Sequence, residues 1–212
     1  MNILKSVVLL ISVLMIACSS SRAKTVDSSS KEWGGVSEVR NPGKFKEVQM
    51  STVADIYYVQ RKGNPYMRIS GNKEFVERIK TEVNGGTLRI YSDKEYKGKN
   101  NEKVKIEIFS SSVEKISVSG VGNVYMNEKV ALGDLELQVS GVGNMNITDL
   151  SCKNLTAKVS GVGNMDIAGK CRTAELSMSG VGHIDCNELS GKIESCSVGG
   201  VGSVKTANGK IK

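Results

Sequence analysis

Apolar and polar residues alternate along most of the chain after residue 44, and a glycine-rich motif interrupts the alternation at regular intervals. The motif is Ser-Gly-Val-Gly followed by Asn or His, and it begins at Ser119, Ser140, Ser160 and Ser179, with a degenerate copy from Gly199. Directly after the motifs, apolar residues stand two apart, at Val124 and Met126, Met145 and Ile147, Met165 and Ile167, and Ile184 and Cys186. A period of two is typical of a β-strand with one buried face. We therefore predict short strands before and after each motif, with the glycines at the corner between them.

The regular spacing of the corners predicts the architecture. The motif recurs about every 20 residues, as in repeat proteins whose units bury their apolar faces only against one another. Stacked units would place like residues above one another, with parallel strands about 4.8 Å apart. We therefore predict an all-β, single-domain solenoid, a parallel β-helix, and we expect a right-handed coil from the usual chirality of parallel crossovers. A β-propeller is excluded because each of its blades needs about 40 residues. A leucine-rich repeat fold is excluded because its Leu/Asn consensus is missing.

The first 18 residues have the pattern of a bacterial lipoprotein signal. A basic residue precedes an apolar run of signal-peptide length, and the run ends in Met-Ile-Ala-Cys at Cys18, which resembles a lipobox. We predict a signal peptide at residues 1–18 and lipidation of Cys18. The alternative is an ordinary signal peptide in which Cys18 has no role. The serine-rich stretch that follows predicts a flexible tether at residues 19–42, ahead of a folded domain at residues 43–212.

The first part of this domain is less regular than the repeats. Short alternating segments are separated by turns that contain Gly, Asn or Pro. Residues 73–83 have apolar side chains at helical spacing, which predicts one short helix that ends before Gly85 and Gly86. A basic polar loop is expected at residues 94–105, before the alternation resumes. Coiling at one spacing through the whole domain would produce roughly eight coils.

The charge of the chain is uneven. Its 212 residues include 29 Lys and Arg against 22 Asp and Glu, and the formal net charge is +7. The surplus of basic residues lies before residue 111, and all ten aromatic residues lie between Trp33 and Tyr125. A basic, aromatic surface could meet anionic glycans, lipid headgroups or nucleic acid. A solvated loop beside core aromatics is the simpler interpretation, and we expect no nucleic-acid partner for an exported protein.

The order of these segments resembles the head GIN domain family of putative autotransporter adhesins on bacterial envelope lipoproteins. The resemblance covers residues 43–212 and lies in the segments from Phe45 (FKEV), from Asp55 (DIYYVQ) and from Gly86 (GTLRI), and in the serial Ser-Gly-Val-Gly-Asn corners. The family more often has Ser-Gly-Ser-Gly-Asp at its corners, so no site built on that Asp is carried over. The resemblance implies a right-handed β-helix and an envelope location. It implies no established activity.

Stacking would align polar residues of the corners in two columns. The serine column is Ser119, Ser140, Ser160 and Ser179, and the second column is Asn123, Asn144, Asn164 and His183. Stacked amides or hydroxyls can hydrogen-bond along the axis and stiffen the corners, so we expect structural ladders. The alternative is a polar stripe that recognises a repeating ligand such as a glycan. The corners are not phosphate-binding loops, because no Lys-Ser/Thr and no helix follow them.

The four cysteines of the repeats also fall into columns. Cys152 and Cys171 align in successive units, and Cys186 and Cys196 replace Ile or Leu at inward positions. A Cys152–Cys171 disulfide is one interpretation for an exported protein, because stacked rungs lie within disulfide reach. Buried thiols that act as small apolar side chains are the other, because sister units carry apolar residues there. With one His and no Cys-x-x-Cys pair, we predict no metal site and no cofactor.

Three functional hypotheses fit this pattern. The first is a non-catalytic, lipid-anchored envelope protein that presents a β-helical surface for binding or adhesion. The second is a carbohydrate-active enzyme, a polysaccharide lyase or hydrolase, which would need paired carboxylates. Asp166 and Asp185 share an outward column, but surface carboxylates that face solvent explain them without catalysis, so we predict no catalytic residue. The third is a structural or assembly protein of the envelope.

The expected partners follow from these hypotheses. They are the membrane, through the lipid on Cys18, and a glycan or an envelope protein on the exposed face. A second copy of the chain is expected at the end of the last coil, where open strand edges need a cap. We expect the outer membrane as the location and favour its periplasmic side, because no acidic run follows Cys18.

Overall fold

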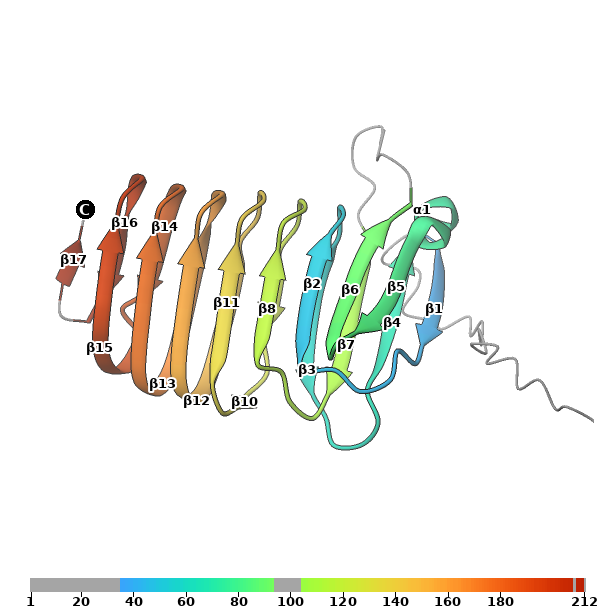
Figure 1. Cartoon of the computed structure of the whole chain (residues 1–212), viewed down its shortest axis with the longest axis horizontal. Helices are drawn as coiled ribbons and strands as arrows, with labels where there is room; N and C mark the ends of the chain where they lie inside the picture. The colour runs from blue at the N-terminus through green and yellow to red at the C-terminus, as the bar shows by residue number, and fades with distance from the viewer. Residues whose placement is uncertain (1–34, 94–103, 208, 212) are drawn as a thin grey trace, which may run out of the picture.

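The computed structural model describes residues 35–93, 104–207 and 209–211. The predicted signal peptide with Cys18, most of the tether and most of the basic loop lie outside the described residues. Within the described part, the chain forms seventeen strands and one helix of six residues. The strands lie side by side along the long axis of the molecule (Figure 1), so the predicted all-β solenoid is confirmed. Its right-handedness stays a prediction.

Two sheets run along the molecule. The first sheet contains, in spatial order, β5 (Ile79–Asn84), β6 (Thr87–Ser92), β2 (Glu47–Ser51), β8 (Lys115–Val118), β11 (Leu135–Val139), the second halves of β12 (Met145–Val159) and β13 (Val162–Met178), and β15 (Leu189–Val198). The second sheet contains β1 (Val36–Arg40), β4 (Tyr66–Gly71), β7 (Lys105–Ser110), β3 (Asp55–Gln60), β9 (Val124–Met126), the first halves of β12 and β13, β14 (Val181–Cys186), β16 (Val201–Thr206) and β17 (Gly209–Ile211). The two-residue strand β10 (Val130–Ala131) pairs with the middle of β12 and begins a short third side.

The core consists of columns of apolar side chains that continue from rung to rung. In the second sheet, one column of register partners is Val124, Met145, Met165, Ile184 and Val204. In the first sheet, one column is Ile116, Leu137, Ala157 and Leu176. All of these side chains are at most 1% exposed. Each rung covers the apolar side chains of its neighbours, which is why a unit this short folds only within a stack.

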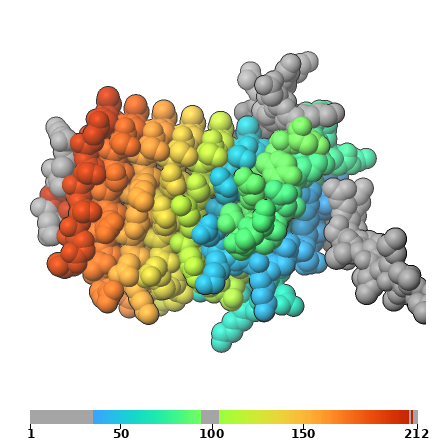
Figure 2. All heavy atoms as spheres, in the orientation of Figure 1, coloured from blue at the N-terminus to red at the C-terminus, as the bar shows by residue number. Residues whose placement is uncertain are grey.

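The N-terminal end departs from simple coiling. The rung made by β2 and β3 lies between the rung of β6 and β7 and the rung of β8 and β9, so chain order and spatial order differ there. In Figures 1 and 2, the rung of β2 and β3 is the blue band between the green band of β6 and β7 and the yellow-green band of β8 and β9. Beyond it, β1 pairs with β4, β4 with β7 and β5 with β6, all antiparallel. The expectation of uniform coiling through the whole domain is therefore wrong for this end.

Two predicted boundaries change in this region. The helix α1 (Lys73–Arg78) is capped by Asn72, whose Oδ1 accepts from the Glu74 N–H at 3.0 Å, and it stops at Ile79, which is extended with φ −67° and ψ 123°. The rest of the predicted helix at residues 73–83 is β5, because pairing with β6 outweighs a helical spacing of apolar residues. Residues 36–40, which we assigned to the tether, form β1 and pair with β4. The described part of the chain contains no helix with the length and hydropathy of a membrane span.

Outward charged side chains pair between rungs. The Glu136 carboxylate lies 3.3 Å from the Lys115 Nζ and 3.2 Å from the Lys158 Nζ, one rung away on either side. Partial burial opposes ionisation of this carboxyl, but the hydrogen bonds from Lys158 and Lys115 outweigh it and lower the pKa of Glu136. Such a pair of bridges links three rungs across the surface of the first sheet.

Candidate binding face

The Ser-Gly-Val-Gly corners join the first sheet to the second, and they carry an exposed apolar stripe. The valines of the corners are register partners, and this valine column is Val53, Val121, Val142, Val162, Val181 and Val201. Val121 and Val181 are 48% exposed, Val142 and Val162 are 50% exposed, and Val201 is 74% exposed. No other sequence position in the repeats exposes an apolar residue of this size on every rung of the described solenoid.

Close backbone packing keeps the corners in place. A Cβ added to Gly141 would collide with the carbonyl oxygen of Gly120, and one added to Gly143 would collide with that of Gly122. Hydrogen bonds also continue through the corners, because the Val142 N–H donates to the Gly120 carbonyl at 3.0 Å. Since only glycine permits this approach, the valines between the glycines stand on a rigid, evenly spaced frame.

The asparagine column lies two residues beyond the valine column, and its first member is a carboxylate. Asp55, which is 6% exposed, accepts from the main-chain N–H and the Nδ2 of Asn123, at 2.8 and 2.9 Å. The Asn123 Oδ1 accepts in the same way from Asn144, at 3.1 and 3.0 Å, and the Asn144 Oδ1 from Asn164, at 3.1 and 3.0 Å. The His183 main-chain N–H donates to the Asn164 Oδ1 at 3.1 Å. The asparagine column is thus a one-directional chain of hydrogen bonds that ends on Asp55.

Asp55 was missed as a member of this column. It lies 68 residues before Asn123 in the sequence, so it falls outside the regular repeat. A signal was present, because Val-Ala-Asp-Ile-Tyr from Val53 has the same pattern as Val-Gly-Asn-Val-Tyr from Val121. The register of Ile56 with Val124 and of Tyr57 with Tyr125 makes the two segments equivalent.

The serine column forms hydrogen bonds along the axis in which main-chain carbonyls are the acceptors. The hydroxyls of Ser119, Ser140 and Ser179 donate to main-chain carbonyls of the preceding rung, at 3.2 to 3.5 Å. At Ser160, the main-chain N–H donates to the Val139 carbonyl at 2.8 Å. These serines therefore tie each corner to the backbone below it.

A shallow hollow lies between the valine and asparagine columns. Its volume is about 470 Å³, its floor is formed by the second glycines of four corners, and its sides are the valines and asparagines. The rungs that line it carry Val121, Val142, Val162 and Val181, whereas Val201 lies outside it. We call this hollow the trough. It is apolar on one side and presents side-chain amides on the other.

A third outward column lies two residues beyond the asparagines. Its members are Tyr57, Tyr125, Asn146, Asp166, Asp185 and Lys205. The two tyrosine rings stack on each other with centroids 4.7 Å apart, and the Lys105 Nζ lies 4.7 Å from the centre of the Tyr57 ring. The faces that the two rings turn toward each other are therefore covered. We call the valine, asparagine and third columns together the corner face.

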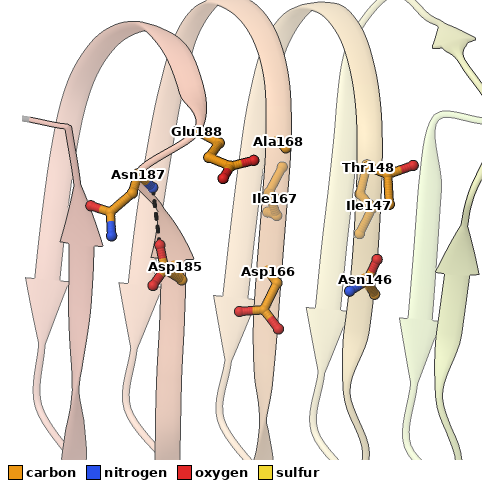
Figure 3. A pocket seen from close by; sticks show the side chains of 9 residues that line it. All are labelled: Asn146, Ile147, Thr148, Asp166, Ile167, Ala168, Asp185, Asn187 and Glu188. Atoms are coloured by element: carbon orange, nitrogen blue, oxygen red, sulfur yellow. Dashed lines mark hydrogen bonds between the residues drawn. The ribbon is translucent and has the colours of Figure 1, made fainter.

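The two aspartates of the third column line a second hollow, of about 360 Å³, with Glu188 on the loop above them (Figure 3). The Asp185 carboxylate accepts from the Asn187 N–H at 3.0 Å and lies 3.3 Å from the Lys205 Nζ. The Asp166 carboxylate lies 3.6 Å from the His183 Nε2. Each aspartate thus has a basic neighbour of its own. No cluster of three metal-ligating side chains occurs in the ranges that the structure covers.

The cysteines of the repeats lie away from the corner face. Cys152 and Cys171 are register partners in neighbouring rungs, and the thiols of Cys152, Cys171, Cys186 and Cys196 are free. Burial raises the pKa of the Cys152 and Cys186 thiols to about 12. Thiols with so little thiolate react slowly with oxidants and alkylating agents. A disulfide between Cys152 and Cys171 stays a prediction.

Comparison with known proteins supports the interpretation of the fold. Residues 44–212 match the family described as "Putative auto-transporter adhesin, head GIN domain". A search of curated proteins finds no match. The chain is similar to the crystal structure of a putative adhesin from Bacteroides fragilis, with 28% identity and a TM-score of 0.69 over 81% of this chain and 96% of the other.

Two further structures share the fold at lower identity. One is a putative adhesin from Parabacteroides distasonis, at 22% identity and a TM-score of 0.60 over 81% of each chain. The other is a putative lipid binding protein from the same species, at 19% identity and a TM-score of 0.57 over 82% of this chain and 97% of the other. The β-solenoid fold is thus shared with these structures.

Proposed function

Because the chain belongs to the family of putative auto-transporter adhesins with a head GIN domain, we propose that it is a non-catalytic binding protein of the cell envelope. The partner binds on the corner face. The observation that carries this proposal is the valine column, in which five apolar side chains about half exposed or more follow one another along the axis. Contiguous exposed apolar surface is the usual mark of an interaction site.

The rigidity of the corners supports this role. The valines from Val121 to Val201 span about 19 Å, four steps of the strand spacing. Their backbone is held by hydrogen bonds and by glycine contacts between rungs. A partner would therefore bind a surface that is already ordered, and it would lose little affinity to the ordering of loops.

The anchor and the compartment belong to the same proposal. A lipid on Cys18 holds the domain at the outer membrane, on the periplasmic side, with the serine-rich stretch as its tether. Replacement of Cys18 by Ser should move the protein from the membrane fraction to the soluble fraction of the cell. Retention of the Cys18→Ser variant in the membrane would contradict a lipid anchor.

Two arginines at the centre of the valine column test the binding role. In the V142R/V162R variant, long charged side chains cover the trough, while half-exposed positions leave the core unchanged. We expect this variant to lose binding to immobilised envelope fractions of the bacterium that makes the protein. The matched control is Val36→Arg, which makes the same substitution at an exposed valine of β1 outside the corner face, and which should bind as the unchanged protein does. Circular dichroism and the melting temperature show whether each variant is folded. Equal binding by a folded V142R/V162R variant would refute the proposed face.

The end of the solenoid supports a second contact, with another copy of the chain. β17 covers part of the edge of β16, but no strand among the described residues pairs with the outer edge of β15. The inward residues of β15 are half-buried, namely Ile193, Cys196 and Val198. Their register partners in β13 are fully buried. We expect self-association through β15 that Ile193→Lys weakens. Sedimentation that shows a strict monomer at high concentration would contradict it.

A further inference from the structure

We infer that the ligand of the corner face is a linear, neutral polysaccharide of N-acetylated sugars that lies along the solenoid axis with its acetamido groups in the trough. This inference rests on the proposed function and adds the chemical class of the partner. It follows from three properties of the trough, namely the hydrogen-bond donors on one side, the methyl groups on the other and the repeat distance.

Two asparagines of the column, Asn123 and Asn144, present only donors to a ligand. Their Oδ1 atoms each accept two hydrogen bonds from the next rung, which uses both lone pairs of each oxygen. Each Nδ2 of Asn123, Asn144 and Asn164 carries two hydrogens and donates one of them to the rung before. One N–H on each of these three rungs therefore remains for a ligand. A matching ligand must supply acceptors along the axis and needs no donor at Asn123 or Asn144.

The valine column adds an apolar requirement next to these donors. The valine and the asparagine of one corner are two residues apart, so their Cα atoms lie about 6.6 Å apart in extended backbone, and the glycine between them adds no side chain to the trough. An acetamido group is flat and carries a carbonyl acceptor and a methyl group on the same carbon. In the trough, its carbonyl would accept from an Asn Nδ2 while its methyl packs against a valine. A bare hydroxyl group offers an acceptor but nothing for the valines to contact.

The repeat distance favours a polysaccharide over a peptide. An extended peptide presents the same side every two residues, about 6.8 Å, and falls out of step with rungs about 4.8 Å apart. In an extended β-1,4-linked polysaccharide, successive sugars are turned by about half a turn, so the same side recurs every two sugars, close to two rung spacings or about 9.6 Å. The acetamido groups of alternate sugars can therefore meet alternate rungs with the same contacts.

The charges of the third column favour a neutral ligand. Asp166, Asp185 and Glu188 line the hollow next to the trough. Asp185 is paired with Lys205 and Asp166 lies beside His183, but the three carboxylates outnumber these two basic side chains, so a polysaccharide of uronic acids would be repelled. The carboxylates can accept hydrogen bonds from sugar hydroxyl groups that project beyond the asparagine column.

The test compares two oligosaccharides that differ at the group in question. The hexamer of β-1,4-linked N-acetylglucosamine carries acetamido groups, and cellohexaose has the same linkage with hydroxyls in their place. Isothermal titration with the purified protein should give at least tenfold tighter binding of the acetylated hexamer. Equal affinities, or preference for cellohexaose, would overturn the inference.

A single substitution tests the donors of the asparagine column. Asn164→Asp keeps an oxygen for the His183 N–H but replaces the free N–H, on a rung in step with Asn123, with a negative oxygen, so affinity for the acetylated hexamer should fall at least tenfold. Asn84→Asp makes the same change at an exposed position of β5, at the far end of the first sheet, and it should leave the affinity unchanged. Unaltered affinity of a folded Asn164→Asp variant would overturn the inference.

The envelope assay separates this inference from the proposed function. If neither hexamer binds but V142R/V162R still abolishes binding to the envelope fraction, the N-acetylated ligand is wrong and the binding face stands. If the acetylated hexamer binds and V142R/V162R has no effect on it, the sugar is bound elsewhere and the inference fails, whereas the proposed face is refuted only if V142R/V162R also keeps its binding to the envelope fraction.

Discussion

Replacement of Asp55 by Ala should destabilise the solenoid at the rung where chain order and spatial order diverge. The carboxylate of Asp55 is the acceptor on which the asparagine column ends. It holds the main-chain N–H and the side-chain amide of Asn123 at 2.8 and 2.9 Å. Alanine provides neither acceptor, and the site is too enclosed for water to replace both, since Asp55 is 6% exposed.

The expected loss can be estimated from these two hydrogen bonds. A hydrogen bond to a charged group contributes about 1.5–3 kcal/mol to stability, and a buried donor without an acceptor costs about 1–3 kcal/mol. Removal of the buried carboxylate also removes its desolvation cost, which offsets part of the loss. We therefore expect Asp55→Ala to lower the free energy of unfolding by about 3 kcal/mol. Asp55→Asn keeps an oxygen at the same position and matches the residue type of Asn123, Asn144 and Asn164, so it should lose less than about 1 kcal/mol.

Urea unfolding followed by circular dichroism measures both variants. The m-value must stay constant for the comparison, because a solenoid can lose cooperativity when one rung is weakened. An Asp55→Ala variant within about 0.5 kcal/mol of the unchanged protein would refute the role assigned to this carboxylate. Equal losses for the two variants would show that the charge of Asp55, and not its position as an acceptor, matters.

Three further predictions concern the corners, the surface pairs and the thiols. Gly163→Ala should cost about 2 kcal/mol or more, because its Cβ would collide with the carbonyl oxygen of Gly143, whereas Gly133→Ala, which meets nothing within 4 Å, should be nearly neutral in the same urea assay. Glu136→Gln should lower the free energy of unfolding at pH 7 by up to about 1 kcal/mol. Because the pKa of Glu136 is lowered in the folded state, the ion pairs of Glu136 stabilise the protein above the ordinary pKa of 4.5, and this stabilisation disappears as the pH falls below that value. The stabilities of the two proteins should therefore converge in acid. The Cys152 thiol, with a pKa of about 12, should resist iodoacetamide at pH 8 in the folded protein and react with it in urea. Mass spectrometry measures the labelling, and rapid labelling of the folded protein would contradict the partial burial of this thiol.

Much of the fold could be predicted because it is local and repeated. The alternation of apolar residues around each corner determines which side chains point inward, as the burial of Met145 and Met165 confirms. The N-terminal end could not be read in this way. Residues 79–83 continue the helical spacing of the predicted helix but belong to β5, which pairs with β6. Val36–Arg40 lies in the segment assigned to the tether but pairs with β4. In both cases a partner strand that lies elsewhere in the sequence decides the conformation.

The sequence by itself determined that the chain stacks short units, because a period of about 20 residues leaves each unit with an apolar face that only its copies can cover. Only the tertiary structure decided what the corners present. It turned the serine hydroxyls toward the backbone, exposed the valines, and joined the asparagines into a chain that ends on Asp55. The reason is that the directions of hydrogen bonds depend on the register between rungs. That register brings together residues as far apart in the sequence as Asp55 and Asn123, which the repeat of about 20 residues does not connect.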